Sequence, residues 1–264
     1  MSRSIEKTVR INAPVNVVWR ALTEAEELKR WFPIDARVKP GPEGAIWLSW
    51  GDAMEAESPI TAWEPNRRLQ TTQTRGPVKL ALDFHLETKG GRTVVRLVHS
   101  GFGDGPEWDD EFHMTDGGWT YFMAHLRLYL ERHRGTARDV IVFREALPVS
   151  RNEALRRLIG PSGLSIDNAL ATATAGTPFT TTTAAGQTIS GSVIAASHQS
   201  GQFGLTIAEL NDAVLFFEME PHETGVRAAL WLSTYALPPS RLEEVRRQFA
   251  DLYQRALEVP FALK

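Results

Sequence analysis

Hydrophobic and polar residues alternate at the start of the chain. Ile5, Val9 and Ile11 fall on one parity, and charged or hydroxyl side chains fill the other. A period of two predicts a half-exposed β-strand over residues 5–11. The strand is expected to end there, because the Asn-Ala-Pro sequence that follows favours a turn.

Helical spacing replaces this alternation from Pro14 onward. Proline suits the first turn of a helix, and the apolar residues that follow recur every three or four positions. This pattern predicts a helix over residues 14–23 and a short second helix over residues 24–30. Trp31 and Phe32, followed by a proline, form the corner that closes the second helix.

Further strands are predicted between this corner and residue 101. Their connections contain Gly-Asp, Glu-Pro-Asn, Gly-Pro and Gly-Gly sequences, all of which favour turns. Short connections of this kind imply an antiparallel meander. The predicted strands are residues 45–50, 53–63, 68–74, 78–87 and 93–101.

A long amphipathic helix is predicted over residues 107–133. We expect Gly117 and Gly118 to disturb its start, because glycine is a poor helix former. A long helix laid across an antiparallel sheet tends to leave an apolar hollow between the two. The apolar stripe of this helix consists of Trp119, Phe122, Met123, Leu126 and Leu130.

The order of strand, proline-led helix and terminal helix occurs a second time. Residues 139–143, 148–159 and 239–259 repeat it, so the chain is predicted to contain two α+β units of similar design. The stretch over residues 169–200 is rich in Thr, Ala, Ser and Gly, and the repeat predicts strands there. Residues 134–138 are the expected linker.

The two copies differ at their aromatic and polar landmarks. An ungapped alignment places residues 91–100 on residues 225–234, so that His99 falls opposite Ser233. A second ungapped block places Trp119 opposite Val245. The histidine and the tryptophan at these positions therefore occur only in the first copy.

Composition narrows the class of protein. The 264 residues are 42% hydrophobic, which suffices for two cores, and the net charge of -3 gives no electrostatic footprint for nucleic acid or an anionic membrane. The absence of cysteine excludes disulfides and suits a reducing compartment. No signal-peptide core or membrane-length apolar run occurs, so we expect a cytoplasmic protein.

Five motifs occur along the chain: Ile-Asn-Ala-Pro at residues 11–14, the helix 17–23, Leu-Lys-Arg-Trp-Phe at 28–32, His-Ser-Gly-Phe at 99–102 and Gly-Trp at 118–119. Together they resemble the START/Bet v1-like (SRPBCC) superfamily and, within it, the branch labelled after the activator of Hsp90 ATPase. The resemblance covers residues 5–133 well and residues 139–259 in outline. It implies two tandem helix-grip domains, each a curved antiparallel sheet wrapped around a long C-terminal helix.

This resemblance implies one domain over residues 1–134 with a ligand cavity and a divergent domain over residues 139–264. Because the superfamily serves many functions, the resemblance specifies the fold better than the function. We expect the cavity to bind a hydrophobic, aromatic or polyketide-type small molecule. Its predicted ligand-binding residues are Trp31, Phe32, Leu80, Leu82, Phe84, Val95, Leu97, His99, Gly118, Trp119, Phe122 and Met123.

Sequence motifs for other chemistry are missing. No phosphate loop, nucleophile elbow, zinc-protease motif or dinucleotide fingerprint occurs, so no cofactor is predicted. His85 and His99 should face opposite sides of the sheet by parity. A metal site from His99, Glu111 and His113 lacks convergent ligands, and no metal is predicted. Acidic residues at the entrance of the long helix are interpreted as solvated charge near a helix N-terminus.

Three functional classes remain open at this stage. The first is a binding protein for an apolar small molecule, and the second is a cyclase or aromatase that uses His99 as an acid or base. The third is a co-chaperone that acts through surface contacts. A narrower form of the first class is self-resistance to enediyne antibiotics, with the Cα of Gly117 or Gly118 as hydrogen donor. The lack of convergent titratable groups favours binding over catalysis.

Overall fold

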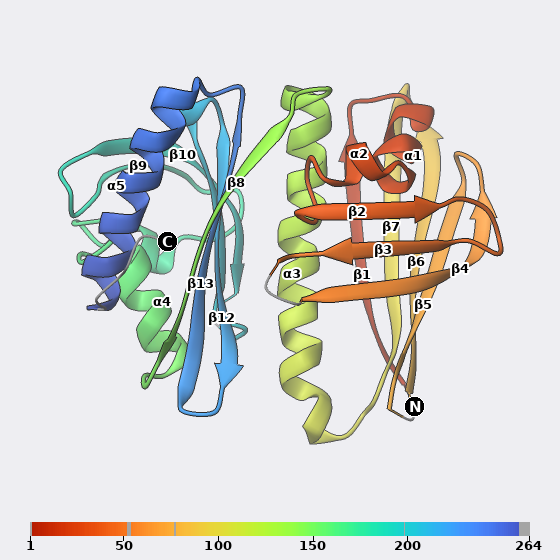
Figure 1. Cartoon of the computed structure of the whole chain (residues 1–264), viewed down its shortest axis with the longest axis horizontal. Coiled ribbons are helices and arrows are strands. Elements are labelled where there is room, and N and C mark those ends of the chain that lie inside the picture. Colours follow the sequence, from red (N-terminus) through yellow and green to blue (C-terminus); the bar gives the residue numbers. More distant parts are fainter. Residues whose placement is uncertain (1, 52–53, 77, 198, 259–264) are drawn as a thin grey trace. The chain divides into compact units, whose positions relative to one another are not determined.

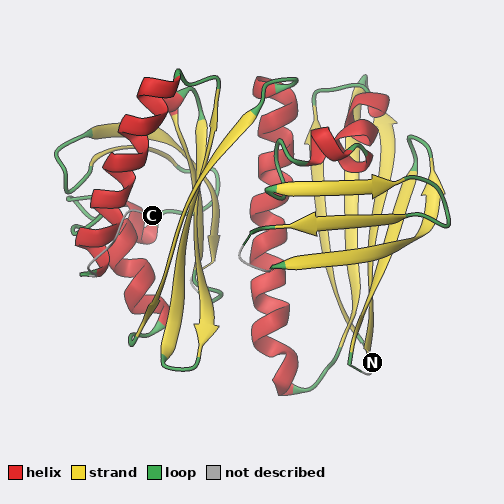
Figure 2. Ribbon diagram, viewed as in Figure 1, coloured by secondary structure: helices red, strands yellow, loops and turns green. Residues whose placement is uncertain are grey.

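Two antiparallel sheets and their helices make up the protein. The structure, a computed structural model, describes residues 2–51, 54–76, 78–197 and 199–258. The chain divides into two compact units, Met1–Ala137 and Arg138–Lys264. Each unit has one sheet and a long helix at its C-terminal end, as Figure 1 and Figure 2 show. The expected α+β class with tandem helix-grip folds is therefore confirmed. None of the described helices combines the length and the hydropathy that a membrane span needs.

The first unit has a seven-stranded sheet with the order β1-β7-β6-β5-β4-β3-β2, which closes the predicted meander by pairing its first and last strands. Two short helices follow β1, and the long helix α3 comes last. A 3-10 turn, Pro106–Trp108, precedes α3, and a π-helical turn, Tyr129–His133, follows it. The elements are β1 (Arg3–Ile11), α1 (Val15–Thr23), α2 (Ala25–Leu28), β2 (Asp35–Lys39), β3 (Ala45–Ser49), β4 (Glu55–Glu64), β5 (Arg68–Arg75), β6 (Val78–Lys89), β7 (Arg92–Phe102) and α3 (Asp109–Leu128).

Strand β2 was not predicted from the sequence. Asp35, Arg37 and Lys39 make up most of this five-residue strand, and Ala36 is its buried residue. It lies at the end of the sheet and pairs with β3. Charged residues are typical of edge strands, and they leave no apolar alternation to detect. The strand predicted from residue 53 corresponds to β4, and residue 53 itself lies outside the described residues.

Helix α3 is continuous through Gly117 and Gly118, so the predicted disturbance was wrong. Both glycines are buried, and packing of the helix outweighs their low propensity. Ion pairs fix α3 along the edge strand β1. The Arg3 guanidinium lies 2.6 Å from Asp109, and the Lys7 ammonium lies 2.8 Å from Asp116. Figure 2 shows α3 running the length of the first sheet.

The second unit has a six-stranded sheet with the order β8-β13-β12-β11-β10-β9. Strands β9 and β10 confirm that the Thr-rich stretch forms strands. Helix α4 begins at a serine cap, where the Ser150 hydroxyl accepts a hydrogen bond from the backbone of Glu153 at 3.2 Å. The elements are β8 (Arg138–Leu147), α4 (Arg151–Ile159), β9 (Pro178–Thr182), β10 (Thr188–Ser197), β11 (Gln202–Ile207), β12 (Ala213–His222), β13 (Gly225–Tyr235) and α5 (Pro239–Leu257).

Side chains from the second sheet and its helices fill the interior of this unit. The ring of Tyr253 on α5 lies 5.8 Å from the ring of Phe143, and its hydroxyl donates to the Ala228 carbonyl at 2.6 Å. A continuous apolar core results. It includes Leu205, Leu215, Phe217, Leu230, Leu232, Val245, Phe249 and Leu252.

Strand register corrects the alignment of the two copies. The pair Lys89 and Arg92 closes the β6–β7 hairpin, and the pair His222 and Gly225 closes the β12–β13 hairpin. Matching the hairpins shifts the predicted alignment by one residue, and a shift of one residue moves every side chain to the other face of a sheet. The counterpart of His99 is therefore Leu232, not Ser233.

Candidate functional site

One face of the first sheet carries the predicted ligand-binding residues of β6 and β7. Leu82 pairs with His99, and Phe84 pairs with Leu97, so these four residues lie on the same face. The ring of Phe84 lies 5.9 Å from that of Trp119 on α3, which identifies this face as the inner one. Buried members of the face are Leu80, Phe84, Val95 and Leu97, whereas Leu82 and His99 are half-buried.

Phe32 joins the inner face to the helix. Its ring centroid lies 5.5 Å from that of Trp119 and 4.6 Å from that of Phe122. The ring of Trp50, which the sequence did not single out, lies 5.4 Å from that of Phe32 and meets it edge to face. The structure thus brings aromatic residues from the α2–β2 connection, from the end of β3 and from α3 into one cluster.

Trp31 has a different position from Phe32. Its side chain is 1% exposed, and its indole nitrogen donates to the Ala21 carbonyl at 2.9 Å. Its ring stacks on that of Phe32 with a centroid distance of 5.0 Å, so Trp31 fixes the position of Phe32. On α3, Gly118, Trp119 and Met123 are buried and Phe122 is half-buried.

His99 is the polar group of the inner face. The indole Nε1–H of Trp119 donates to His99 Nδ1 at 3.0 Å, so Nδ1 carries a lone pair and the proton of the neutral ring lies on Nε2. Burial, and then the positive charge of Arg75, lower the pKa of His99 to about 4. The imidazole is therefore neutral at pH 7. No described residue hydrogen-bonds Nε2.

The acidic run at the start of α3 contacts arginines of the sheet. Asp109 pairs with Arg3, and Glu111 pairs with Arg75 at the end of β5. These carboxylates thus fix the helix, in addition to favouring its N-terminus. Within the described ranges, no three His, Asp or Glu side chains are grouped so that they could hold a metal ion.

Sequence reasoning missed the polar residues of β4 and β5 on the inner face. Gln73 donates to the Ser58 hydroxyl at 2.8 Å, and Thr71 is 6% exposed. The sequence does place Leu69, Thr71 and Gln73 at every second position, which is the spacing of residues on one face of a strand. Threonine is common in strands, however, and parity alone does not say which face is covered.

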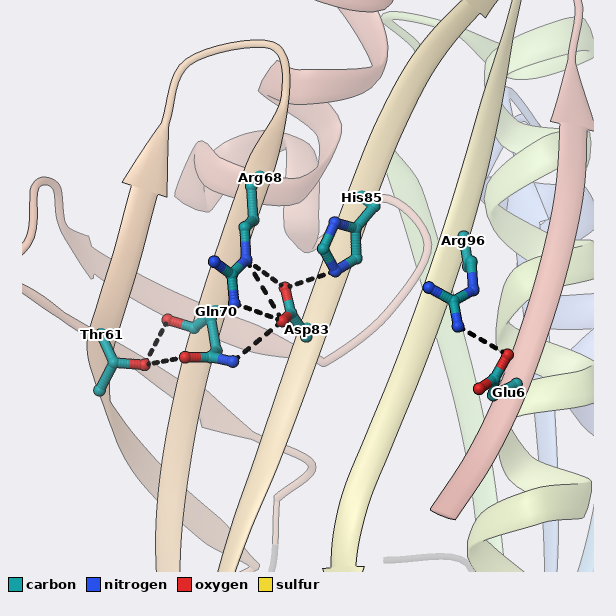
Figure 3. Close-up of polar contacts among 7 residues, drawn as sticks. All are labelled: Glu6, Thr61, Arg68, Gln70, Asp83, His85 and Arg96. Carbon is teal, nitrogen blue, oxygen red and sulfur yellow. Dashed lines mark hydrogen bonds and ion pairs between the residues drawn. The ribbon is translucent and has the colours of Figure 1, made fainter.

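A second polar cluster lies on the opposite, outer face, as parity predicts for His85 (Figure 3). Asp83 accepts hydrogen bonds from Arg68 at 2.8 Å and from Gln70 at 2.9 Å, and its carboxylate lies 3.2 Å from His85. Burial alone would raise the pKa of Asp83, but the hydrogen bond from Arg68 and the electrostatic interaction with His85 lower it overall. The cluster satisfies the carboxylate fully and joins β5 to β6, which is a structural role.

Asp83→Asn should lower the free energy of unfolding by about 1 to 2 kcal/mol at pH 7, because it removes the charge that Arg68 hydrogen-bonds. The depressed pKa means that the carboxylate stabilises the fold above its unfolded pKa of about 4, and that this stability is lost as pH falls through the folded pKa. Urea unfolding at pH 7 and at pH 3 checks both effects. The control is Glu6→Gln at the exposed pair with Arg96, which should cost under about 1 kcal/mol. Equal costs for the two variants would contradict the assignment.

The first unit has the helix-grip architecture of the START/Bet v1-like class: an antiparallel sheet, two short helices after its first strand, and a long C-terminal helix against its inner face. Residues 12–131 match the family described as "Activator of Hsp90 ATPase homolog 1-like protein". The match lies within the first unit, and the second unit repeats that unit's order of strands and helices. No curated protein sequence matches the chain significantly.

Solved structures of similar fold include proteins from several bacteria. CalU16 from Micromonospora echinospora is 24% identical over 50% of this chain and 78% of its own, with a TM-score of 0.42. The Aha1 dimer from Colwellia psychrerythraea is 22% identical over 50% of this chain and 99% of its own, with a TM-score of 0.44. DynU16, a protein of the dynemicin biosynthetic locus, is 17% identical over 97% of this chain and 96% of its own, with a TM-score of 0.43.

Proposed function

We propose that the first unit binds a hydrophobic, aromatic or polyketide-type small molecule between the inner face of its sheet and helix α3. Incomplete burial of that face is the observation that carries the proposal. Leu82 and His99 face α3 and are nevertheless half-buried, whereas their counterparts Leu215 and Leu232 in the second unit are 0% exposed. Apolar surface left accessible inside a fold is surface that a ligand can cover.

The residues around this surface suit an aromatic ligand. Phe32, Trp119 and Phe122 present ring faces and edges at several angles, which can stack on or contact a flat ring system. Met123 adds an adaptable side chain on the same helix. The N–H on His99 Nε2 supplies one hydrogen-bond donor for orientation.

Electrostatics favour binding over catalysis. A cyclase or aromatase with this fold would move a proton through His99, and a catalytic acid or base works best when its pKa lies near the working pH. Burial and Arg75 lower the pKa of His99 to about 4, so at pH 7 the ring is a weak base and lacks the imidazolium proton that a general acid would donate. The co-chaperone alternative rests on the family description alone.

Self-resistance to an enediyne is a narrower form of this proposal. Gly117 and Gly118 are buried in α3 beside Trp119. An aryl diradical would take one hydrogen atom from the Cα of one glycine, which forms a ligand C–H bond and leaves a backbone radical stabilised by the flanking peptide groups. The second radical centre of the ligand would take its hydrogen atom from another C–H donor, such as a solvent or buffer molecule. Addition of dissolved oxygen to the backbone radical would then lead to cleavage of the chain. Each protein molecule would be consumed by one ligand.

Leu82→Trp should lower the affinity for aromatic ligands at least about tenfold, because the larger ring fills the space that the ligand needs. Ala81→Trp is the matched control, since the adjacent residue points to the outer face and its substitution should leave affinity unchanged. The measurement is titration of the full chain with polyketide-like aromatics, including an enediyne, followed by tryptophan fluorescence and by mass spectrometry of the chain. Binding that survives in Leu82→Trp would overturn the proposed site, and many turnovers with an intact chain would favour the cyclase.

A further inference from the structure

One row of the inner face in the first unit has two polar residues on either side of a leucine. Thr71 pairs with Leu82, and Leu82 pairs with His99. Their strands β5, β6 and β7 are neighbours in the sheet (Figure 1). They lie on the face that contacts Trp119, because His99 accepts its hydrogen bond from that residue. Neighbouring strands lie about 4.8 Å apart, so the backbones of Thr71 and His99 are separated by roughly 10 Å.

Both polar residues of this row have an unused hydrogen-bonding group. Thr71 is 6% exposed, and no described residue hydrogen-bonds its hydroxyl. The hydroxyl oxygen is not among the buried side-chain atoms that lack a partner, so it keeps surface that a ligand oxygen can reach. In the next row of the face the polar side chains pair with each other, because Gln73 donates to the Ser58 hydroxyl at 2.8 Å. His99 Nε2 is likewise without a partner among the described residues.

The second unit provides an internal comparison for this row. Its register pairs Leu205 with Leu215 and Leu215 with Leu232, at the positions that match Thr71, Leu82 and His99. All three leucines are 0% exposed and belong to the core of that unit. Leucine at all three positions is therefore sufficient for this part of the fold to form. The polar pair is not needed for folding, and it remains available for a ligand.

We infer that Thr71 and His99 together determine which ligand the first unit accepts: an oxygenated polycyclic aromatic with polar groups on two opposite edges. This inference rests on the proposed binding function. His99 donates from Nε2 to a carbonyl or hydroxyl oxygen at one edge, and the Thr71 hydroxyl bonds an oxygen at the other. The ring system lies over Leu82, between the two polar groups. A ligand without these oxygens leaves both groups unpaired, which disfavours it.

Two probes of the same ring shape test this inference in the full chain: a dihydroxyanthraquinone and anthracene, which has no oxygen. Thr71→Val keeps the shape of the side chain and removes the hydroxyl. We expect it to weaken binding of the anthraquinone about three- to tenfold and to leave anthracene binding unchanged. Thr71→Ser should restore the affinity, and Thr72→Val on the outer face should affect neither probe.

The possible outcomes separate the two proposals. A Thr71→Val chain that binds both probes as the natural chain does would overturn the role of Thr71 and leave the binding function in place. Preference of the natural chain for anthracene would also overturn the inference. Failure of the natural chain to bind either probe would count against the binding function itself, and the inference would fall with it. Thermal melting of each variant confirms that it is folded.

Discussion

Replacing Leu232 with histidine is expected to lower the stability of the second unit by at least about 3 kcal/mol, because an imidazole without a partner would be buried in a filled core. The reciprocal change in the first unit, His99→Leu, should alter stability by less than about 1.5 kcal/mol. That position is half-buried, and leucine is what the second unit has there. Urea unfolding combined with hydrogen exchange on each unit measures both changes. Equal losses would mean that the two interiors are filled alike.

The pH dependence of stability provides a second test of the His99→Leu variant. The pKa of His99 is lowered from 6.5 to about 4 in the folded chain, so the unfolded chain binds the proton first as pH falls. Stability due to the neutral ring is therefore complete above pH 6.5 and is lost as pH falls toward 4, by up to about 3 kcal/mol. His99→Leu should remove this part of the acid sensitivity. A variant that stays as acid-sensitive as the natural chain would contradict the assignment.

Periodicity predicted most of the fold because most elements bury one face. The period of two at residues 5–11 and the apolar stripe of α3 follow directly from that burial. Strand β2 was not predicted because its residues are mainly charged. The repeat was recognised, but its alignment was one residue out of register, since an ungapped match of similar residues carries no information on which face each one occupies. Hairpin pairing supplied that information.

The candidate site was predicted less completely than the fold. Parity placed His99 correctly relative to His85, and the aromatic residues of α3 meet Phe32 as the resemblance implied. The hydrogen bond from Trp119 to His99 could not be predicted, because it joins residues whose approach depends on how the helix packs on the sheet. Thr71 was missed since a threonine in a strand is unremarkable until its hydroxyl is found without a partner.

Trp119→Ala should have the other large effect, with a loss of about 3 to 5 kcal/mol in the stability of the first unit and of most ligand affinity. The residue is 6% exposed, and its ring contacts Phe32, Phe84 and Phe122. Trp119→Phe is the matched variant, because it retains an aromatic ring and removes the indole N–H. It should cost only about 1 kcal/mol, the net value of one hydrogen bond.

The two variants together separate packing from positioning. In Trp119→Phe, His99 Nδ1 loses its donor, so the ring is no longer restricted to the tautomer with the proton on Nε2, and its pKa should rise while burial still holds it below the ordinary value. Nitrogen NMR of the imidazole reports the tautomer directly. We expect a mixture of tautomers and a weaker preference for oxygenated ligands in Trp119→Phe, with apolar ligands bound nearly as before. Unchanged nitrogen shifts would mean that Trp119 contributes packing alone and that something else orients the histidine.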